Sequence, residues 1–540
     1  MRRLRPCLLL LPALFFAPPV QTATSDPPPL PKPRPVLPEA RFLSVSTDHP
    51  YAGDGPMFAT VTPNGDGYRD FVRIRFYLTA TASVTVRAQA SQRNFQRIPQ
   101  PAWAVRRTMT RGWQEVTWRP MQSLDPTTYV MLIKVARGRN VLQYGRLTRA
   151  STNPASPIVR VLAADVSLDR PSYNPGDTAR LTVASDAAAL TVHVLDVAGT
   201  ETQPTATHID ATDFVTPVHV AWDAHRDAPA TIPLAIGDWK PGVYFVAVVS
   251  DAGDIGYAPL IVKAPRPTNR VAVLIPDHTW FAYDYFDDNL DGFPDSWYYP
   301  AGNDIVSLAR PFDHFGIPWQ FNSQMWPFLR WLRLHNAAAD FISESDLIAL
   351  GDSLAQAYDL IVVPTHLEYV TEAEYDALQH YRDAGGDLIF LASNDIYWKV
   401  EINATTMHRV AKWRAVGRPE SALVGAQYAG SKTNDAGAYV AEDSSAAAWA
   451  FAGTGVGPNT AFSDAGGEFD LTTSSSPPGT QVLATVRTPF HRGEMTYYDL
   501  GAAKVFAPGT FFTARVLQPT ESRLLENVWN HSDAPDLPAG

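Results

Sequence analysis

Short runs in which apolar and polar residues alternate follow the N-terminal segment of the chain. Turn residues separate these runs, the first of which lie at 72–78, 83–88, 113–118 and 129–135. A period of two is typical of strands that bury one face, and this spacing of strands and turns favours a sandwich of two sheets. The pattern predicts an immunoglobulin-like β-sandwich over residues 40–150.

A second group of short runs follows a proline-containing stretch at 153–157. Glycine, proline and aspartate separate its members, which lie at 179–184, 191–196, 242–250 and 257–262. Because these residues are typical of turns between strands, the pattern predicts another sandwich. We therefore expect two immunoglobulin-like sandwiches in tandem, the second over residues 158–265.

From about Arg270 the chain changes to strands that alternate with helices. Residues 271–275 and 360–363 are continuous apolar runs, as expected for parallel strands that are covered on both faces. Helical spacing of apolar residues follows at 325–335 and again at 371–384. This alternation predicts an α/β domain with a parallel sheet and helices on both faces, over residues 270–535.

The strand at 360–363 ends in a group of polar side chains. His366, Glu368 and Tyr369 follow Pro364, and a helix is predicted to begin at Thr371. In open α/β sheets, ligands bind just beyond the carboxyl ends of the strands. His366 and Glu368 are two residues apart, so an extended backbone directs them to the same side. Such a pair is suited to metal binding or acid–base catalysis, or it is a hydrogen-bonded pair that fixes the loop.

The loop after the strand at 271–275 is the second candidate for chemistry. Residues 276–286 contain Asp277, His278, Tyr283, Asp284 and Tyr285. If the two strands are neighbours in a parallel sheet, this loop comes within reach of Glu368. The alternative is that its aromatic residues cover the end of the sheet.

Residues 287–295 read DDNLDGFPD, which resembles the start of an oxygen-rich calcium loop. The candidate calcium ligands are Asp287, Asn289, Asp291 and Asp295. A calcium loop usually has a bidentate glutamate at its twelfth position, where this chain has Tyr298. The alternatives are a structural calcium site and an acidic turn.

The N-terminus predicts export. Three arginines precede an apolar segment at 7–16, which is the layout of a signal peptide and is too short to span a bilayer comfortably. The alternative is an uncleaved membrane anchor. A proline-rich linker follows, and the predicted order is a signal peptide (1–23), linker (24–39), sandwich (40–150), sandwich (158–265) and α/β domain (270–535). We expect a secreted, periplasmic or cell-surface protein without a membrane span after signal removal.

Several classes of site are excluded by composition. The formal net charge of −11 without a concentrated basic patch argues against a nucleic-acid partner. The only cysteine, Cys7, lies in the predicted signal, so the mature chain has no thiolate site and no disulfide. No glycine-rich phosphate loop follows residues 271–275, and residues 364–368 lack the cysteine or serine of an acyl-enzyme nucleophile.

Several ordered motifs resemble the N,N-dimethylformamidase large (beta) subunit family. They are Thr279–Asp284, Arg310–Phe312, His366–Tyr369 and Leu388–Val400. Residues 173–176, 180–183 and 241–244 are similar to the sandwich that precedes the family's C-terminal domain. The resemblance covers roughly residues 162–530 and leaves the first sandwich outside.

The resemblance implies a glutamine amidotransferase-like (flavodoxin-like) α/β domain that hydrolyses a small dialkyl amide. It also implies a mononuclear iron that is held by two tyrosines and one glutamate, with a histidine nearby. Carried over, Tyr283 and Glu368 are iron ligands, and His366 and Glu368 are the catalytic pair. We expect the second tyrosine near Phe312, which cannot ligate iron, so Tyr285, Tyr298 or Tyr299 replaces it or the site is incomplete.

Two functions therefore remain open. One is an exported hydrolase that cleaves a C–N amide bond of a small substrate at a mononuclear iron. The other is a non-catalytic surface or secreted protein that binds a glycan or protein through its sandwiches and a degenerate enzyme-like domain. The predicted signal peptide, the tandem sandwiches and Phe312 favour the second function, whereas Tyr283 and residues 366–369 favour the first.

Overall fold

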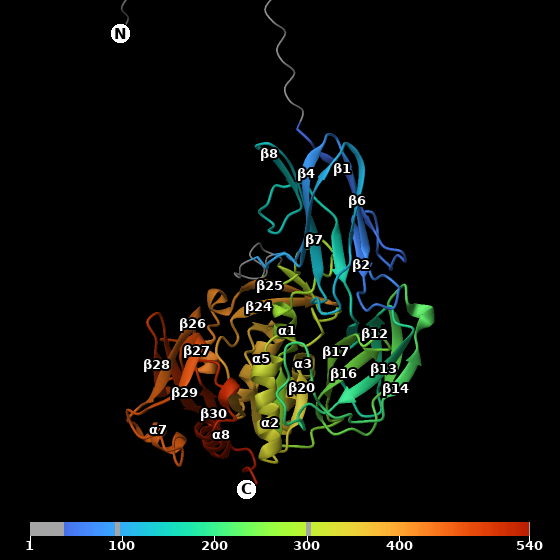
Figure 1. The fold of residues 1–540 in the computed structure, drawn as a ribbon. Coiled ribbons are helices and arrows are strands. Elements are labelled where there is room, and N and C mark those ends of the chain that lie inside the picture. The colour runs from blue at the N-terminus through green and yellow to red at the C-terminus, as the bar shows by residue number, and fades with distance from the viewer. Residues whose placement is uncertain (1–36, 92–97, 299–303, 539–540) are drawn as a thin grey trace, which may run out of the picture. The chain divides into compact units, whose positions relative to one another are not determined.

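The computed structural model describes residues 37–91, 98–298 and 304–538 (Figure 1). The predicted signal peptide and most of the predicted linker lie outside these ranges. Residues from Pro38 onward form one compact unit. Within the described ranges, no helix has both the length and the apolar character that crossing a membrane requires.

The N-terminal strands form two sheets around a shared core. In the first sheet, β3 lies between β1 and β6, and in the second the order is β2-β9-β7-β4-β5, with β8 paired to β7. Ile74, Phe76 and Val84 are fully buried in the core between them because alternate residues of each strand point inward. The bounds are β1 (Ala40–Ser46), β2 (Phe58–Val61), β3 (Val72–Leu78), β4 (Ala82–Gln89), β5 (Trp103–Met109), β6 (Gly112–Trp118), β7 (Thr128–Arg137), β8 (Asn140–Tyr144) and β9 (Ile158–Val161).

The next strands form a second pair of sheets, in the orders β10-β12-β15 and β11-β17-β16-β13-β14. Val246 and Val248 of β16 face the core between these sheets, whereas Phe245 and Ala247 pack into the core of the C-terminal region. Burial on both faces explains why β16 is a continuous apolar run. The bounds are β10 (Asp165–Leu168), β11 (Ser172–Tyr173), β12 (Thr178–Ala184), β13 (Ala189–Leu195), β14 (Val218–Ala221), β15 (Ala230–Ala235), β16 (Gly242–Ser250) and β17 (Ile255–Val262).

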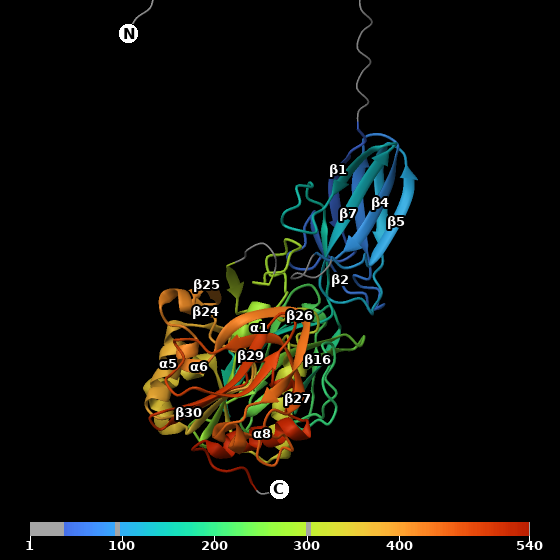
Figure 2. The same ribbon diagram turned by 90° about the vertical axis from the view of Figure 1, so that its left-hand side faces the viewer.

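The C-terminal region is built on a nine-stranded sheet in the order β20-β18-β21-β23-β30-β29-β28-β26-β27. The pairings from β20 to β30 are parallel, and those from β30 to β27 are antiparallel. Figure 2 labels β26, β27, β29 and β30 of this sheet. The bounds are β18 (Val271–Ile275), β20 (Asp340–Ser343), β21 (Leu360–Val363), β23 (Asp387–Phe390), β26 (Gln427–Ala441), β27 (Ala461–Leu471), β28 (Gln481–Arg487), β29 (Arg492–Leu500) and β30 (Ala503–Ala507).

The predicted α/β domain of glutamine amidotransferase-like (flavodoxin-like) type with a parallel sheet is wrong. The protein is 39% strand and 16% helix, and the large sheet is mixed rather than parallel. The physical reason is that the chain returns after β23 through antiparallel hairpins rather than through further helical crossovers. A separate sheet, in the order β19-β25-β24-β22, adds to the strand content of this region. The bounds are β19 (Ile305–Ser307), β22 (Tyr369–Val370), β24 (Trp398–Asn403) and β25 (Thr406–Lys412).

Helices cover both faces of the parallel strands. Leu360 and Val362 of β21 face one core, whereas Ile361 and Val363 face the other, which explains the apolar run at 360–363. The helix α5 begins after Thr371, where the sequence predicted a helix, and the Thr371 hydroxyl accepts the Glu374 N–H in a capping box. The bounds are α1 (Asp277–Tyr283), α2 (Trp326–Leu334), α3 (Glu344–Leu350), α4 (Leu354–Ala357), α5 (Glu372–Asp383), α6 (Ser421–Val424), α7 (Ser445–Ala450) and α8 (Pro519–His531).

A buried arginine joins the two N-terminal groups of strands. The Arg69 side chain is fully buried, donates to the backbone oxygens of His49 at 2.7 Å and Arg226 at 2.8 Å, and forms an ion pair with Asp227. The equally buried Asp186 carboxylate lies 3.6 Å from the Arg69 guanidinium. Burial first, and nearby carboxylates in addition, raise the pKa of Asp186 to about 7.

Asp186 makes stability depend on pH. An aspartate in the unfolded chain has a pKa of about 3.9, so between there and pH 7 the folded chain binds the proton more tightly. The stabilisation that Asp186 contributes is complete below its unfolded pKa of about 3.9. It is lost as the pH rises through its folded pKa of about 7. We expect the free energy of unfolding to fall by up to about 1 kcal/mol per pH unit over this interval.

Urea unfolding at several pH values between 5 and 8 tests this prediction. Asp186→Asn should flatten the pH dependence, whereas Asp223→Asn, whose side chain is 81% exposed, should keep it. An unchanged slope in Asp186→Asn would show that the carboxyl group is already ionised in the folded chain.

Candidate functional site

The candidate site lies where the chain changes direction across the large sheet. After β18 the chain passes to β20 on one side and then to β21 on the other, and β18 is parallel to both. The strand order therefore reverses at β18, and ligands of open sheets bind beyond the carboxyl ends of the strands at such a point. Tyr283 ends α1, directly beyond β18, and Glu368 lies in the loop between β21 and β22.

Two phenols and one carboxylate meet at this edge of the sheet. Tyr283 Oη donates a hydrogen bond to Glu368 Oε2 at 2.7 Å. Tyr298 Oη lies 2.8 Å from the same carboxylate oxygen and 2.5 Å from Tyr283 Oη. Tyr369 Oη is a further 3.2 Å from Tyr298 Oη. The structure therefore brings together the segments near residues 283 and 368, as the sequence predicted.

The second tyrosine does not come from the position of Phe312. Phe312 is buried and stacks on Phe281, with ring centroids 4.6 Å apart. Tyr298 supplies the phenol instead, and its ring stacks on that of Tyr283 with centroids 3.8 Å apart. Tyr299, another candidate, lies outside the described residues. The sequence had left Tyr298 open as one of three possible replacements, beside Tyr285 and Tyr299.

His366 lies beside the phenols with its imidazole almost completely buried. Neither ring nitrogen has a hydrogen-bond partner among the described residues. Nδ1 is 3.8 Å from Glu468 Oε2, an oxygen that also lacks such a partner. The rings of Tyr283 and Phe511 pack against the imidazole, with centroids 5.2 Å and 5.3 Å away. Because buried polar groups are normally hydrogen-bonded, these atoms indicate a place for a ligand.

The local electrostatics favour a bound cation. Burial, and then the nearby Glu468 carboxylate, raise the pKa of Glu368 to about 7. Burial and the charge of Glu368 raise the pKa of the Tyr283 and Tyr298 phenols well above their usual range. Burial also raises the pKa of the Asp395 carboxyl group. A metal ion reverses such shifts because its charge stabilises the anionic form of each ligand.

Backbone contacts fix the loop that carries His366 and Glu368. The Glu368 N–H donates to Thr279 Oγ1 at 3.1 Å, and the Leu367 N–H donates to Asp395 Oδ1 at 2.7 Å. On the outer side, the Trp319 indole stacks on Tyr283 with centroids 4.1 Å apart and is 43% exposed. These contacts orient the site and cover one face of the Tyr283 ring. Sequence reasoning missed Glu468, Asp395 and Trp319, because they come from distant segments.

The predicted calcium ligands form a loop in which the carboxylates accept backbone N–H groups. Asp287 accepts from Asp291 and Gly292, at 3.0 Å and 2.8 Å. Asp295 accepts from Asp288 and Asn289, at 2.9 Å and 3.0 Å. Gly292 has a φ of 83°, as the turn requires. These hydrogen bonds hold the loop, and calcium binding stays a prediction.

Comparison with known proteins relates most of the chain to one family. A family model described as "N,N-dimethylformamidase beta subunit-like, C-terminal" matches residues 165–523. The N,N-dimethylformamidase beta subunit of an Alcaligenes species is 27% identical over 133 residues, and that of Paracoccus aminophilus is 26% identical over 132 residues. Each match covers 23% of this chain and 16% of the relative, so it spans about a sixth of the relative's length.

Among solved structures, a putative ThuA-like protein from Bacteroides uniformis has a TM-score of 0.29 and 13% identity. The match covers 50% of this chain and 95% of that protein. A likeness at this level does not assign a fold.

Asp287 should stabilise the loop that precedes Tyr298. Asp287→Ala removes two backbone hydrogen bonds, one of them to the buried Gly292 N–H, and we expect a loss of about 2–3 kcal/mol in the free energy of unfolding. Asp352→Ala is the control, because that side chain is 96% exposed, and equal effects would contradict the role of Asp287. If calcium binds, it should raise the melting temperature of the unchanged protein but not that of Asp287→Ala.

Proposed function

Because the chain belongs to the N,N-dimethylformamidase beta subunit-like family, we propose that it hydrolyses the C–N bond of a small amide at a mononuclear iron. The proposed iron ligands are Tyr283, Tyr298 and Glu368, and His366 is the proposed acid–base group. The observation that carries the proposal is the meeting of two phenols and one carboxylate within 2.8 Å of one another. Tyr298 provides the second phenol that the family pattern requires.

The donor set fits a hard, highly charged cation. All three proposed ligands would bind through oxygen; Tyr283 and Glu368 are buried, and Tyr298 is partly buried. Phenols and carboxylates are poor neighbours without a counter-charge, as the raised pKa values of Tyr283 and Glu368 indicate. A ferric ion offsets that cost and favours the deprotonated ligands.

A bound iron would act as a Lewis acid that polarises the amide carbonyl and acidifies water. The protein's own part in the reaction is then proton transfer and orientation. His366 accepts a proton from the attacking water and returns it to the amide nitrogen as the C–N bond breaks, so that the amine leaves neutral. Glu468 Oε2, 3.8 Å from His366 Nδ1, stabilises the imidazole while it holds this proton.

The aromatic side chains around the site are suited to a small substrate with apolar groups. The rings of Tyr283, Trp319 and Phe511 surround the His366 imidazole. They exclude water from a site in which charge–charge interactions are correspondingly stronger. A dialkyl amide offers one polar carbonyl and short alkyl groups, which matches this combination of polar and apolar contacts.

We also propose that the protein is exported, and the predicted signal peptide at residues 1–23 is the support for this. The alternative function, a non-catalytic protein that binds a surface glycan or protein, drew its support from the predicted signal peptide, the tandem sandwiches and Phe312. With Tyr298 at Glu368, the geometry favours the enzyme.

The proposed ligands can be tested by metal content. Glu368→Gln and Tyr298→Phe each remove a charged oxygen ligand with little change in shape, so we expect both to lose bound iron and amide hydrolysis. Iron is measured by elemental analysis of the purified protein and by the visible absorption of ferric phenolate. Dimethylamine release from N,N-dimethylformamide measures the hydrolysis.

Tyr375→Phe and Glu372→Gln are the matched controls, since Tyr375 lies in α5 and the Glu372 carboxylate is 62% exposed at the start of the same helix. Both controls should keep wild-type iron. Iron that persists at the wild-type level in Glu368→Gln and Tyr298→Phe would refute the site.

His366→Gln separates metal binding from proton transfer. We expect kcat to fall by roughly 10²–10⁴-fold, the usual contribution of a general acid–base group, while iron content is unchanged. His491→Gln, which removes an imidazole bonded to Asp435 at 2.7 Å, should leave kcat unaltered. Retention of full activity by His366→Gln would exclude His366 from the reaction.

A further inference from the structure

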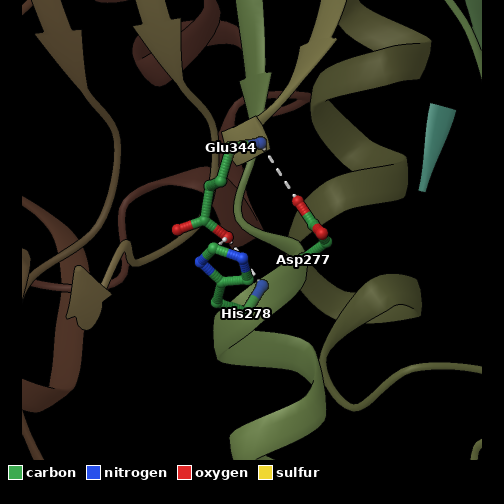
Figure 3. Close-up of side chains that lie close together, drawn as sticks. All are labelled: Asp277, His278 and Glu344. Atoms are coloured by element: carbon green, nitrogen blue, oxygen red, sulfur yellow. Dashed lines mark hydrogen bonds and ion pairs between the residues drawn. The ribbon is translucent and has the colours of Figure 1, made fainter. Parts of the chain in front are cut away.

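A second group of possible metal ligands lies at the beginning of α1, at the opposite end of that helix from Tyr283. Asp277 and His278 follow β18, and Glu344 follows β20. Because Ile275 of β18 pairs with Ser343 of β20, the residues that come directly after each strand are brought together. One donor atom from each of the three side chains lies within 4.8 Å of the others (Figure 3).

The contacts in this group are incomplete. Glu344 Oε2 accepts the backbone N–H of His278 at 2.6 Å, and Asp277 Oδ1 accepts the backbone N–H of Glu344 at 3.1 Å. Glu344 Oε1 and His278 Nδ1 are buried and have no hydrogen-bond partner among the described residues. His278 Nδ1 is 3.4 Å from Glu344 Oε2 and 3.0 Å from Glu374 Oε1, but neither contact is aligned as a hydrogen bond.

The charges in this group are also unbalanced. Asp277, Glu344 and Glu374 place three carboxyl groups around one imidazole, and each side chain is at most 7% exposed. A protonated His278 can offset only one negative charge, and a buried charge without a partner is costly. A divalent cation would offset two charges and would also give Glu344 Oε1 a partner.

A cavity gives access to the group. It has a volume of about 760 Å³ and lies between β10 and β17 of the second pair of sheets and α1, α5 and β24 of the C-terminal region. Asp277 and His278 line it together with apolar residues such as Trp280 and Phe312. None of the described residues that line it belongs to the proposed iron site.

We propose that Asp277, His278 and Glu344 form a second metal site, which takes a divalent ion of the Zn²⁺ class and opens into this cavity. One imidazole nitrogen and carboxylate oxygens are a donor set that zinc accepts. Glu374, beside His278, orients the imidazole and adds negative charge. With ligands at the starts of α1 and α3, which follow β18 and β20, the ion would join the ends of two strands and leave a coordination position toward the cavity for a small ligand.

Zinc titration of the full chain tests this proposal. The protein is stripped with a chelator, titrated with Zn²⁺ by calorimetry, and its bound metal is counted by elemental analysis. Glu368→Gln disables the proposed iron site, so the zinc that this variant still binds reports the second site. We expect one equivalent in Glu368→Gln, and its loss or at least a tenfold weaker Kd when Glu344→Gln is added.

Glu372→Gln is the matched control, because this carboxylate lines the same cavity but bonds to Lys399. In the Glu368→Gln background it should keep the zinc equivalent. Circular dichroism shows whether each variant is folded, and Asp277→Asn, which should also lose zinc, replaces Glu344→Gln if that variant is unfolded.

Two results would overturn the proposal. One is that Glu368→Gln binds no zinc, which would leave a protonated His278 as the counter-ion of the carboxylates. The other is that both Glu344→Gln and Asp277→Asn keep the wild-type zinc affinity. Neither result depends on iron or on amide hydrolysis in the unchanged protein, so the function proposed above can fail or succeed separately.

Discussion

The parallel pairing of β18 with both β20 and β21 is the constraint on which the functional regions depend. It places the start of α1 beside Glu344 and the end of α1 beside Glu368. The register of β18 against its neighbours is fixed by side chains that alternate between two hydrophobic cores, so a slip by one residue would exchange the faces of the strand. The precision of the polar contacts is thus a consequence of apolar packing.

Local patterns predicted the parts of this molecule whose signals are contiguous in sequence. The run at 360–363 identified β21 and the helical pattern at 371–384 identified α5, because burial on two faces and helical periodicity both act over a few residues. The meeting of Tyr283 with Glu368 also followed, since neighbouring parallel strands end at the same edge. These parts needed no knowledge of the remaining chain.

The mixed sheet could not be predicted in the same way. β26 extends over residues 427–441, and its sequence includes glycine, lysine, asparagine and aspartate rather than an apolar run. Its place in the sheet is determined by pairing with β27, which has register shifts, and with β28, and both pairings depend on distant residues. Tyr298 was obscured for a similar reason: it reaches Glu368 only through the path of the acidic loop. The position of β26 in the sheet and that of Tyr298 beside Glu368 are both determined by contacts between separate segments of the folded chain.

The short helix α1 has a consequence for how related chains can differ. It has only seven residues, and its two ends carry His278 and Tyr283. One inserted residue would turn everything beyond it by about 100° around the helix axis and shift it by about 1.5 Å. The phenol would then face away from Glu368 while the imidazole stayed in place. Length variation among relatives should therefore accumulate in the surrounding loops and spare these two helical turns.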